Sequence, residues 1–236
     1  MNQYGSGYSP SQLGVRPAVA LSTAMLTQAF LWMFLGLLVT TAVGWAVSTM
    51  STTQIFKLSG LFLPLVIVQF GIALGLGFAI RRIPAIVGLG LFFIYAAITG
   101  VTLGFALLIY TSASVAAAGL SAAAVFGGAA FYGAVTKRDL TSIGAYLFMA
   151  LVGLIVASFV NLILLHSSTF SLVVSFVAVI IFTGLTAYHV QRIQRGDIAA
   201  WAGTMEKGAV MGAFLMYLDF INLFFALLRI MGSSRR

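Results

Sequence analysis

The sequence predicts an all-α integral membrane protein, and its composition, its charge spacing and the length of its apolar segments all point to that class. Hydrophobic residues make up 61% of the chain and charged residues 7%, with a mean hydropathy of +1.12. Soluble domains carry about 25% charged residues. About 20 apolar residues in helical form cross a bilayer. The uncharged runs of this chain predict seven transmembrane helices and no soluble domain.

Each uncharged run has room for one or two helices. The run 17–56 holds one, and Leu58–Ile80 holds a second over 23 residues. The runs 83–136 and 140–191, of 54 and 52 residues, each hold two helices and a turn. Gly208–Leu228 supplies the last over 21 residues. The expected helices lie near Leu21–Val47, Leu58–Ile80, Ala85–Tyr110, Val115–Val135, Ser142–Leu165, Ser171–Ile193 and Gly208–Ile230.

Residues 17–232 form the predicted seven-helix transmembrane domain, between two short tails. Residues 1–16 are rich in glycine, serine and tyrosine, which is typical of a disordered tail, here a cytoplasmic one. They lack the basic start and cleavage pattern of a signal peptide, so the first helix is expected to remain as an anchor. Residues 233–236 form a short basic C-terminal tail. The absence of cysteine excludes disulfides and thiolate metal ligands.

The basic residues predict the orientation. Alternate loops carry Arg81, Arg82, Lys137, Arg138, Arg192, Arg195 and Lys207, whereas the opposite loops carry only Lys57. The positive-inside rule places those basic loops and the N-terminus in the cytoplasm. Seven crossings then put the C-terminus outside, although it ends in two arginines. Either these arginines are tolerated there or the last segment is re-entrant, and its length favours a full crossing. The net charge of +8 thus reflects topology and not nucleic-acid binding.

Small residues recur at four-residue spacing in three places. The pairs are Gly71/Gly75, Gly100/Gly104 and Ala129/Gly133. This spacing lets helix backbones approach closely in lipid. A chain with 25 glycines also produces such pairs by chance, so we expect them to serve ordinary helix packing.

Asp219 is the residue that says most about function. It is twelfth in the stretch Gly208–Leu228, which holds no other charge. A carboxylate at the middle of a span costs about 2.5–3.5 kcal/mol on insertion scales. Asn222 lies three residues on and shares its helix face. The pattern indicates proton or cation handling; the alternative is a protonated aspartate that only ties neighbouring helices together.

His189 is the second candidate and lies near the basic end of its helix. An imidazole changes charge near pH 6.5 and is the usual pH sensor of proteins. The alternative is a half-solvated histidine at the headgroup level with no particular role. Arg81 and Arg82 end the second helix, and they are either candidates for a latch reaching inward to an acid or topology signals only.

Enzyme chemistry is not expected. An intramembrane aspartyl protease needs two facing carboxylates, and only Asp219 is expected to be buried. A retinal protein needs a lysine inside the last helix, whereas Lys207 stands at its start. The chain has neither the clustered ligands of a catalytic metal nor a phosphate-binding glycine loop. We therefore expect no cofactor.

Three parts of the chain resemble the transmembrane Bax-inhibitor-motif family, in its bacterial branch. They are Thr136–Gly144 with Leu147–Gly153, then Gly184–Tyr188, then Tyr217–Phe224 with Leu227–Ile230. The resemblance covers nearly the whole chain. It implies a seven-helix bundle in the bacterial inner membrane, with the last helix central and wrapped by the other six. It also implies a pH-sensitive calcium leak, survival signalling or regulation of a membrane-bound protease.

The resemblance also implies where the sensor lies. In the family it is a pair of aspartates on the last two helices; Asp219 matches the second, and His189 stands where the first would follow Tyr188. Two facing carboxylates share a proton, whereas an aspartate facing a histidine favours an ionised pair. Calcium prefers six to eight oxygen ligands, so Asp219 would be a weak cation ligand. Some members latch the first aspartate with an arginine at about the place of Arg81 or Arg82.

The predicted function is a pH-modulated cation leak, calcium being the implied transported ion, with Asp219 as titrating group and His189 as its partner. The rival is a non-conducting interaction protein that modulates a membrane-bound quality-control protease. The expected partners are the lipid bilayer and such a protease, with no nucleic acid. The sequence places Asp219 at the middle of the last predicted span and His189 near the basic end of the span before it. Their contact would need a shallow last helix, or arginines that snorkel from well inside the boundary.

Overall fold

The computed structural model describes residues 19–233, and every regular element in that range is helical, which confirms the predicted fold class. The predicted tail 1–16 and residues 234–236 of the C-terminal tail lie outside the described residues. The elements are α1 (Val19–Ser48), α2 (Thr52–Ser59), α3 (Phe62–Ala79), α4 (Ala85–Ile109), α5 (Ser112–Val135), α6 (Thr141–Val160), the π-helical turn η1 (Asn161–Leu165), α7 (Ser168–Gln194), α8 (Asp197–Ala202) and α9 (Met205–Met231).

Within the described residues, six helices are long and apolar enough to cross a membrane: α1, α4, α5, α6 with η1, α7 and α9. Counted together as one broken span, α2 and α3 are a seventh candidate, with a bend of 56° at the break. Pro64 explains the bend, because a proline inside a continuous helix loses a backbone hydrogen bond and clashes with the preceding turn. Pro64 instead lies in the first turn of α3, where it neither removes a helical hydrogen bond nor clashes with a preceding turn. The single helix predicted over Leu58–Ile80 is therefore divided.

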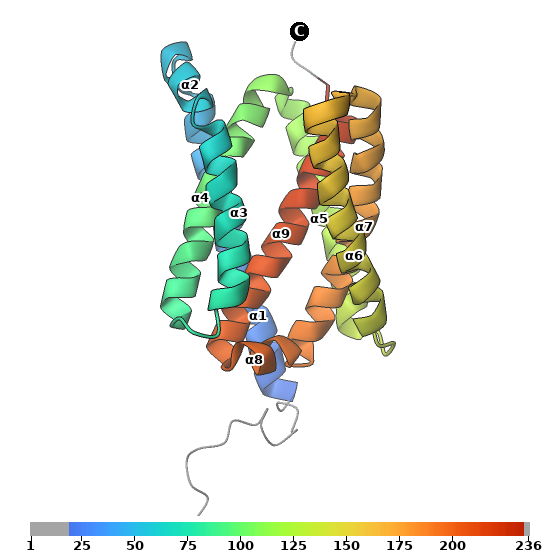
Figure 1. Cartoon of the computed structure of the whole chain (residues 1–236). Coiled ribbons are helices and arrows are strands. Elements are labelled where there is room, and N and C mark those ends of the chain that lie inside the picture. The colour runs from blue at the N-terminus through green and yellow to red at the C-terminus, as the bar shows by residue number, and fades with distance from the viewer. Residues whose placement is uncertain (1–18, 234–236) are drawn as a thin grey trace, which may run out of the picture.

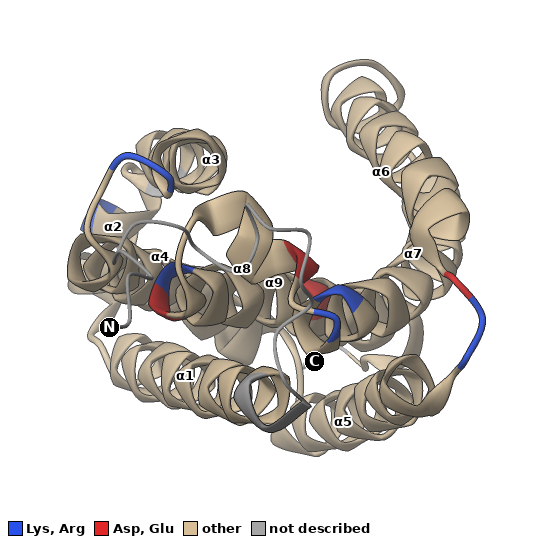
Figure 2. Ribbon diagram, turned by 90° about the horizontal axis from the view of Figure 1, so that it is seen from below, with Lys and Arg blue, Asp and Glu red and all other residues tan. Residues whose placement is uncertain are grey.

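Helix α9 runs obliquely through the middle of the bundle (Figure 1), and more than half of its residues are buried. It packs mainly against α1, α4, α5, α7 and α8. Helix α3 lies against α4, and α6 lies against α7. Both outer helices stand on the same side of the bundle, apart from each other (Figure 1; Figure 2). The predicted central position of the last helix is confirmed, with α3 and α6 forming an outer layer.

Two of the three predicted small-residue pairs lie where helix backbones meet. A methyl group on Gly100 of α4 would lie 2.6 Å from the Cβ of a valine in α1. A methyl group on Gly133 of α5 would lie 2.8 Å from the Cα of Ala187 in α7. Gly71 and Gly75 of α3, in contrast, are exposed and have open space around them. Close packing of α1 with α4 and of α5 with α7 thus depends on glycine, which has no side chain, at these positions.

A buried hydrogen bond joins α1 to α9. The Thr40 Oγ1 atom lies 2.6 Å from the Tyr217 hydroxyl, and it lies 2.9 Å from the carbonyl oxygen of Ala96 in α4. Carbonyl oxygens only accept, so the threonine donates to a backbone carbonyl and the tyrosine donates to the threonine. Both side chains are at most 1% exposed. The bond fixes the rotation of α9 about its axis, two residues before Asp219.

Replacing Tyr217 with phenylalanine is expected to lower the free energy of unfolding by about 0.5–1.5 kcal/mol, because one buried hydrogen bond is lost while Thr40 keeps its carbonyl partner. Thermal unfolding in detergent measures the loss. Tyr217→Ala also empties a large buried volume and should cost about 3–5 kcal/mol. Equal losses in the two variants would show that the hydrogen bond is what the tyrosine contributes, and that its ring adds nothing.

The two ends of the bundle differ in charge. Figure 2 looks onto the end that carries α8, where lysine and arginine gather at the α3–α4, α5–α6 and α7–α9 junctions. Helix α9 begins at this basic end and finishes at the other, beside the start of α5. There the Ser233 N–H donates to Ser114 Oγ at 2.9 Å, and the Thr111 N–H donates to the Ser233 carbonyl at 3.1 Å. The last helix therefore runs the length of the bundle, as a full crossing requires.

Candidate functional site

His189 of α7 and Asp219 of α9 contact each other inside the bundle. The Nδ1 atom of His189 lies 2.7 Å from Oδ2 of Asp219. The aspartate side chain is 2% exposed and the imidazole 12%. The other ion pair of the described residues, Arg195 with Asp139, lies at the exposed basic end. The fold thus brings together the two side chains that the sequence predicted as sensor and partner.

The packing of α7 against α9 explains how a mid-helix aspartate meets a histidine near a helix end. Ile193 in the last turns of α7 packs on Gly212, where a methyl group would lie 2.9 Å from Ile193 Cδ1. His189 is one turn before Ile193, so in this antiparallel pair it lies level with residues 216–219. The part of α9 before Gly212 packs beside α8, beyond the end of α7. The offset of α9 relative to α7 along the bundle therefore brings the two side chains to one level.

The net charge of the pair changes as protons bind. With Asp219 ionised and His189 neutral, Nδ1–H donates to Oδ2 and the site carries one net negative charge. A second proton on the imidazole, at Nε2, makes an imidazolium–carboxylate pair that is neutral overall. Protonation of the carboxylate then leaves one net positive charge. Imidazoles ordinarily change charge near pH 6.5, within the range that cells experience.

Few further ligands for a cation lie close to Asp219 among the described residues. Calcium takes six to eight oxygen ligands. In the described part of the chain, no group of three or more His, Cys, Asp or Glu side chains is placed to hold a metal ion. One of the two carboxylate oxygens of Asp219 already faces His189. This arrangement is suited to proton exchange between the two side chains.

The structure does not bring the other predicted site residues to the pair. Arg81 and Arg82 are exposed in the turn after α3, and the Arg81 carbonyl accepts a hydrogen bond from Lys207 Nζ at 3.0 Å. The latch to Asp219 is absent among the described contacts, because this turn lies at the basic end of the bundle. Asn222 donates from Nδ2 to the Leu218 carbonyl of its own helix at 2.7 Å.

Gln191 is a buried polar residue that the sequence did not single out. Its Oε1 accepts from the Leu140 N–H at 2.9 Å, and its Nε2 donates to the Arg138 carbonyl at 2.7 Å. Arg195 adds a hydrogen bond to Asp139 at 2.9 Å. Together these bonds tie the α5–α6 loop to the end of α7. A glutamine beside an arginine near a helix end is usually solvated, so this role could not be predicted from the sequence.

The loop contact at Asp139 is not expected to respond to pH between 8 and 5.5. Hydrogen bonds from Thr141, followed by the interaction with Arg195, lower the pKa of Asp139 from 3.8 to about 2. A lowered pKa in the folded state contributes stability above the usual value, and that stability is lost as pH falls through about 2. Asp139→Asn should therefore leave the pH profile of any flux unchanged in that interval. A moved midpoint in this variant would show that the loop takes part in the response.

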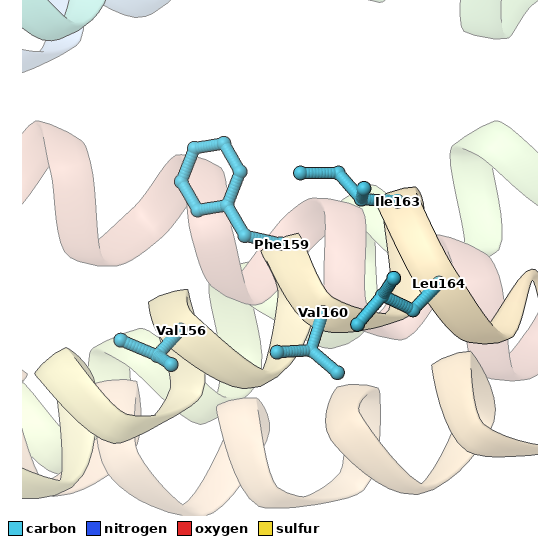
Figure 3. Close-up of a pocket in the computed structure, with 5 residues that line it drawn as sticks. All are labelled: Val156, Phe159, Val160, Ile163 and Leu164. Carbon is cyan, nitrogen blue, oxygen red and sulfur yellow. The ribbon is translucent and has the colours of Figure 1, made fainter.

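A shallow depression of about 250 Å³ lies on α6 and η1, on the outer side of the bundle (Figure 3). Its lining is Val156, Phe159, Val160, Ile163 and Leu164, all exposed and without polar side-chain atoms. In a membrane such a surface faces lipid, and it offers no group that could take part in chemistry.

Known proteins are similar in sequence to this chain over most of its length. A family model described as "Inhibitor of apoptosis-promoting Bax1" matches residues 22–236. The inner membrane protein YbhL of Escherichia coli K12 is 39% identical over 94% of this chain and 96% of its own. Uncharacterised proteins of Borreliella burgdorferi and Rickettsia prowazekii are 38% and 39% identical, over 92% and 80% of this chain and 95% and 82% of theirs. The chain therefore belongs to the Bax inhibitor-1 family and is, with its six to seven apolar spans, an integral membrane protein of that family.

Proposed function

We propose that the protein is a pH-modulated cation leak of the inner membrane, with His189 and Asp219 as its titrating centre. The observation that carries the proposal is the 2.7 Å contact between a buried carboxylate and an imidazole of the neighbouring helix. Ionisable groups within membrane spans are costly and usually serve transport or sensing. The name of the Escherichia coli relative supports the inner membrane as the location. The proposal involves no catalysis and no cofactor.

The charge of the pair gives the expected direction of the pH response. With Asp219 ionised and His189 neutral, the site carries one net negative charge and attracts a cation into the bundle. Proton uptake by His189 neutralises the site, and this attraction is lost. We therefore expect cation flux to fall as pH decreases from about 8 to 5.5. A single carboxylate favours weak binding, which in turn favours release on the far side.

The proposed orientation has the α8 end in the cytoplasm, because the basic residues gather there. The chain has no cysteine, so single cysteines introduced at Lys137 and at Ser51 report each end separately. A membrane-impermeant thiol reagent applied to intact cells is expected to label the residue-51 variant only. Labelling of the residue-137 variant alone would reverse the orientation.

Flux into liposomes tests the proposed function. Calcium and proton flux are measured between about pH 8 and 5.5 for the wild type and for His189→Asp, with empty liposomes as the control. The wild type is expected to leak calcium less as pH falls. His189→Asp is expected to leak more at pH 8, because it adds two oxygen ligands beside Asp219.

Two results would contradict the proposal. A silent wild type beside a conducting His189→Asp variant would mean that the histidine has removed conduction from this fold. Silence of both folded proteins would favour the non-conducting role, in which the bundle modulates another membrane protein.

A further inference from the structure

The turn between α3 and α4 and the first turn of α9 form a basic cluster of three residues: Arg81, Arg82 and Lys207. Lys207 Nζ donates a hydrogen bond to the Arg81 carbonyl at 3.0 Å, which ties the start of α9 to this turn. Both arginines are exposed, and Lys207 is half-buried. Within the described residues none of the three forms an ion pair, whereas Arg195 at the same end is paired with Asp139.

The charge of this cluster attracts an anion. Glu206 is its neighbour in the first turn of α9 and is exposed, so the four side chains together carry a net charge of +2. Basic residues at one end of a membrane protein also follow from its orientation alone. The charges therefore do not identify the anion, and the surface beside them has to distinguish one kind of anion from another.

That surface is a stripe along one face of α9, which we call the open stripe. Its members follow Lys207 at spacings of three or four residues, so they share one helix face. Met211 at its start is 7% exposed, and the members after it are half-buried. These members are Leu215, Leu218, Asn222 and Phe225. The open stripe is therefore apolar over its first half and begins at the basic cluster.

The open stripe faces the side of the bundle between α3 and α6. Phe214 points toward α4, where its ring centroid lies 6.1 Å from that of Phe92, and Asp219 points toward His189 of α7. At about 100° per residue, Leu218 lies between these two directions. Helix α3 lies on α4 and α6 lies on α7, apart from each other (Figure 1; Figure 2). Neither is among the main contacts of α9, so the bilayer reaches the stripe from this side.

The length of the apolar part matches one leaflet. Lys207 and Leu218 are eleven residues apart on α9, which is about 16 Å along the helix. Half of a hydrocarbon core of about 30 Å is about 15 Å. A phospholipid with its headgroup at the basic cluster would therefore lay its acyl chains along Met211, Leu215 and Leu218. An acidic peptide in solution would contact the charges and leave the apolar stripe unused.

We infer that Arg81, Arg82 and Lys207, together with the open stripe, bind an anionic phospholipid of the leaflet at the basic end. The three cations hold the phosphate, and the stripe receives the acyl chains. Basic groups between transmembrane helices bind anionic headgroups in the same way. The site is separate from the His189–Asp219 pair, so the inference does not depend on whether the protein conducts.

Native mass spectrometry of the purified protein in a nonionic detergent tests the inference, with phosphatidylglycerol and phosphatidylcholine as the added lipids. Phosphatidylglycerol is expected to bind about tenfold more tightly or better. Arg81→Gln combined with Arg82→Gln should weaken its binding about 5- to 25-fold, since each charge near an anionic partner contributes about fivefold. Binding of phosphatidylcholine should not change. If this double variant does not fold, Lys207→Gln replaces it, with an expected loss of about fivefold.

The control variant is Lys137→Gln combined with Arg138→Gln. It removes two exposed charges from the same end of the bundle, at the α5–α6 loop and away from α3 (Figure 2). Its affinity for phosphatidylglycerol should stay within about twofold of the wild type. An equal loss in both double variants would overturn the inference, because the general charge of this end, and not the cluster, would then attract the lipid.

Two soluble probes distinguish a lipid from other anions. Glycerol 3-phosphate has the phosphate without acyl chains and should bind about 100-fold more weakly than phosphatidylglycerol, or less. Hexaglutamate carries negative charge on a peptide and should not displace the lipid. Binding of either probe as tightly as phosphatidylglycerol would contradict a lipid site, and so would equal binding of the two lipids.

Discussion

Replacing Asp219 with asparagine is expected to abolish the pH dependence of calcium flux between about pH 8 and 5.5, and to leave the bundle folded. Asparagine keeps the side-chain volume and an acceptor oxygen for His189 Nδ1–H, which lies 2.7 Å from the carboxylate. It cannot carry the negative charge that attracts a cation. Flux at pH 8 should therefore fall about tenfold or more, since losing about 1.4 kcal/mol of attraction is a factor of ten. Liposome flux at the two pH values measures both effects.

The control for this variant is Asn222→Leu, which removes a half-buried amide from the same helix without touching the pair. It should keep the pH response. The free energy of unfolding distinguishes a lost charge from a lost fold. Asp219→Asn should lower it by about 1 kcal/mol. His189→Ala leaves a buried carboxylate without its partner, at a cost of about 3–5 kcal/mol. A wild-type pH profile in Asp219→Asn would show that the negative charge of Asp219 is not needed for the pH response.

A leucine at Gly133 is expected to force α5 away from α7 and to destabilise the bundle strongly. Even a methyl group there would lie 2.8 Å from the Cα of Ala187, and backbone cannot move aside as a side chain does. Overpacking costs about 1–3 kcal/mol in ordinary cores, and separating two backbones reaches the upper end. The unfolding temperature in detergent should fall by about 6–12 °C. Because Ala187 is two residues before His189, the contact with Asp219 should weaken too.

Gly71→Leu is the matched control, because Gly71 is exposed on α3 with open space around it. Its unfolding temperature should stay within about 2 °C of the wild type. Similar losses at both positions would mean that the backbone contact of Gly133 with Ala187 does not limit stability.

The spans were predictable because charges are excluded from the bilayer interior, so their placement marks the loops. The break between α2 and α3 was not predicted, because the span was assigned from the absence of charge over Leu58–Ile80, although Gly60 and Pro64 lie at the break. Helix α8 is too short to show a periodic pattern. Its boundaries are set by Gly196 and Gly203, whose φ angles of 77° and 96° lie in the left-handed region that favours glycine.

The candidate site residues were predictable from chemistry, and their geometry was not. A lone carboxylate in an apolar span identifies Asp219 by its cost, whatever the fold. Its contact with His189 depends on how Ile193 packs on Gly212, a relation between helices that the charge pattern does not encode. The same holds for Thr40 and Tyr217, which are 177 positions apart in the chain.

We propose that contact between imidazole and carboxylate, and not either group alone, sets the pH response of the proposed leak. Exchanging the two groups tests it most directly: calcium flux against pH is measured for His189→Asp, for Asp219→His and for the double variant. Each single variant should lose the wild-type profile, because it pairs two like groups. The double variant should recover a midpoint within about 0.5 pH unit of the wild type. A folded double variant that lies no closer to the wild type than either single variant would contradict the claim.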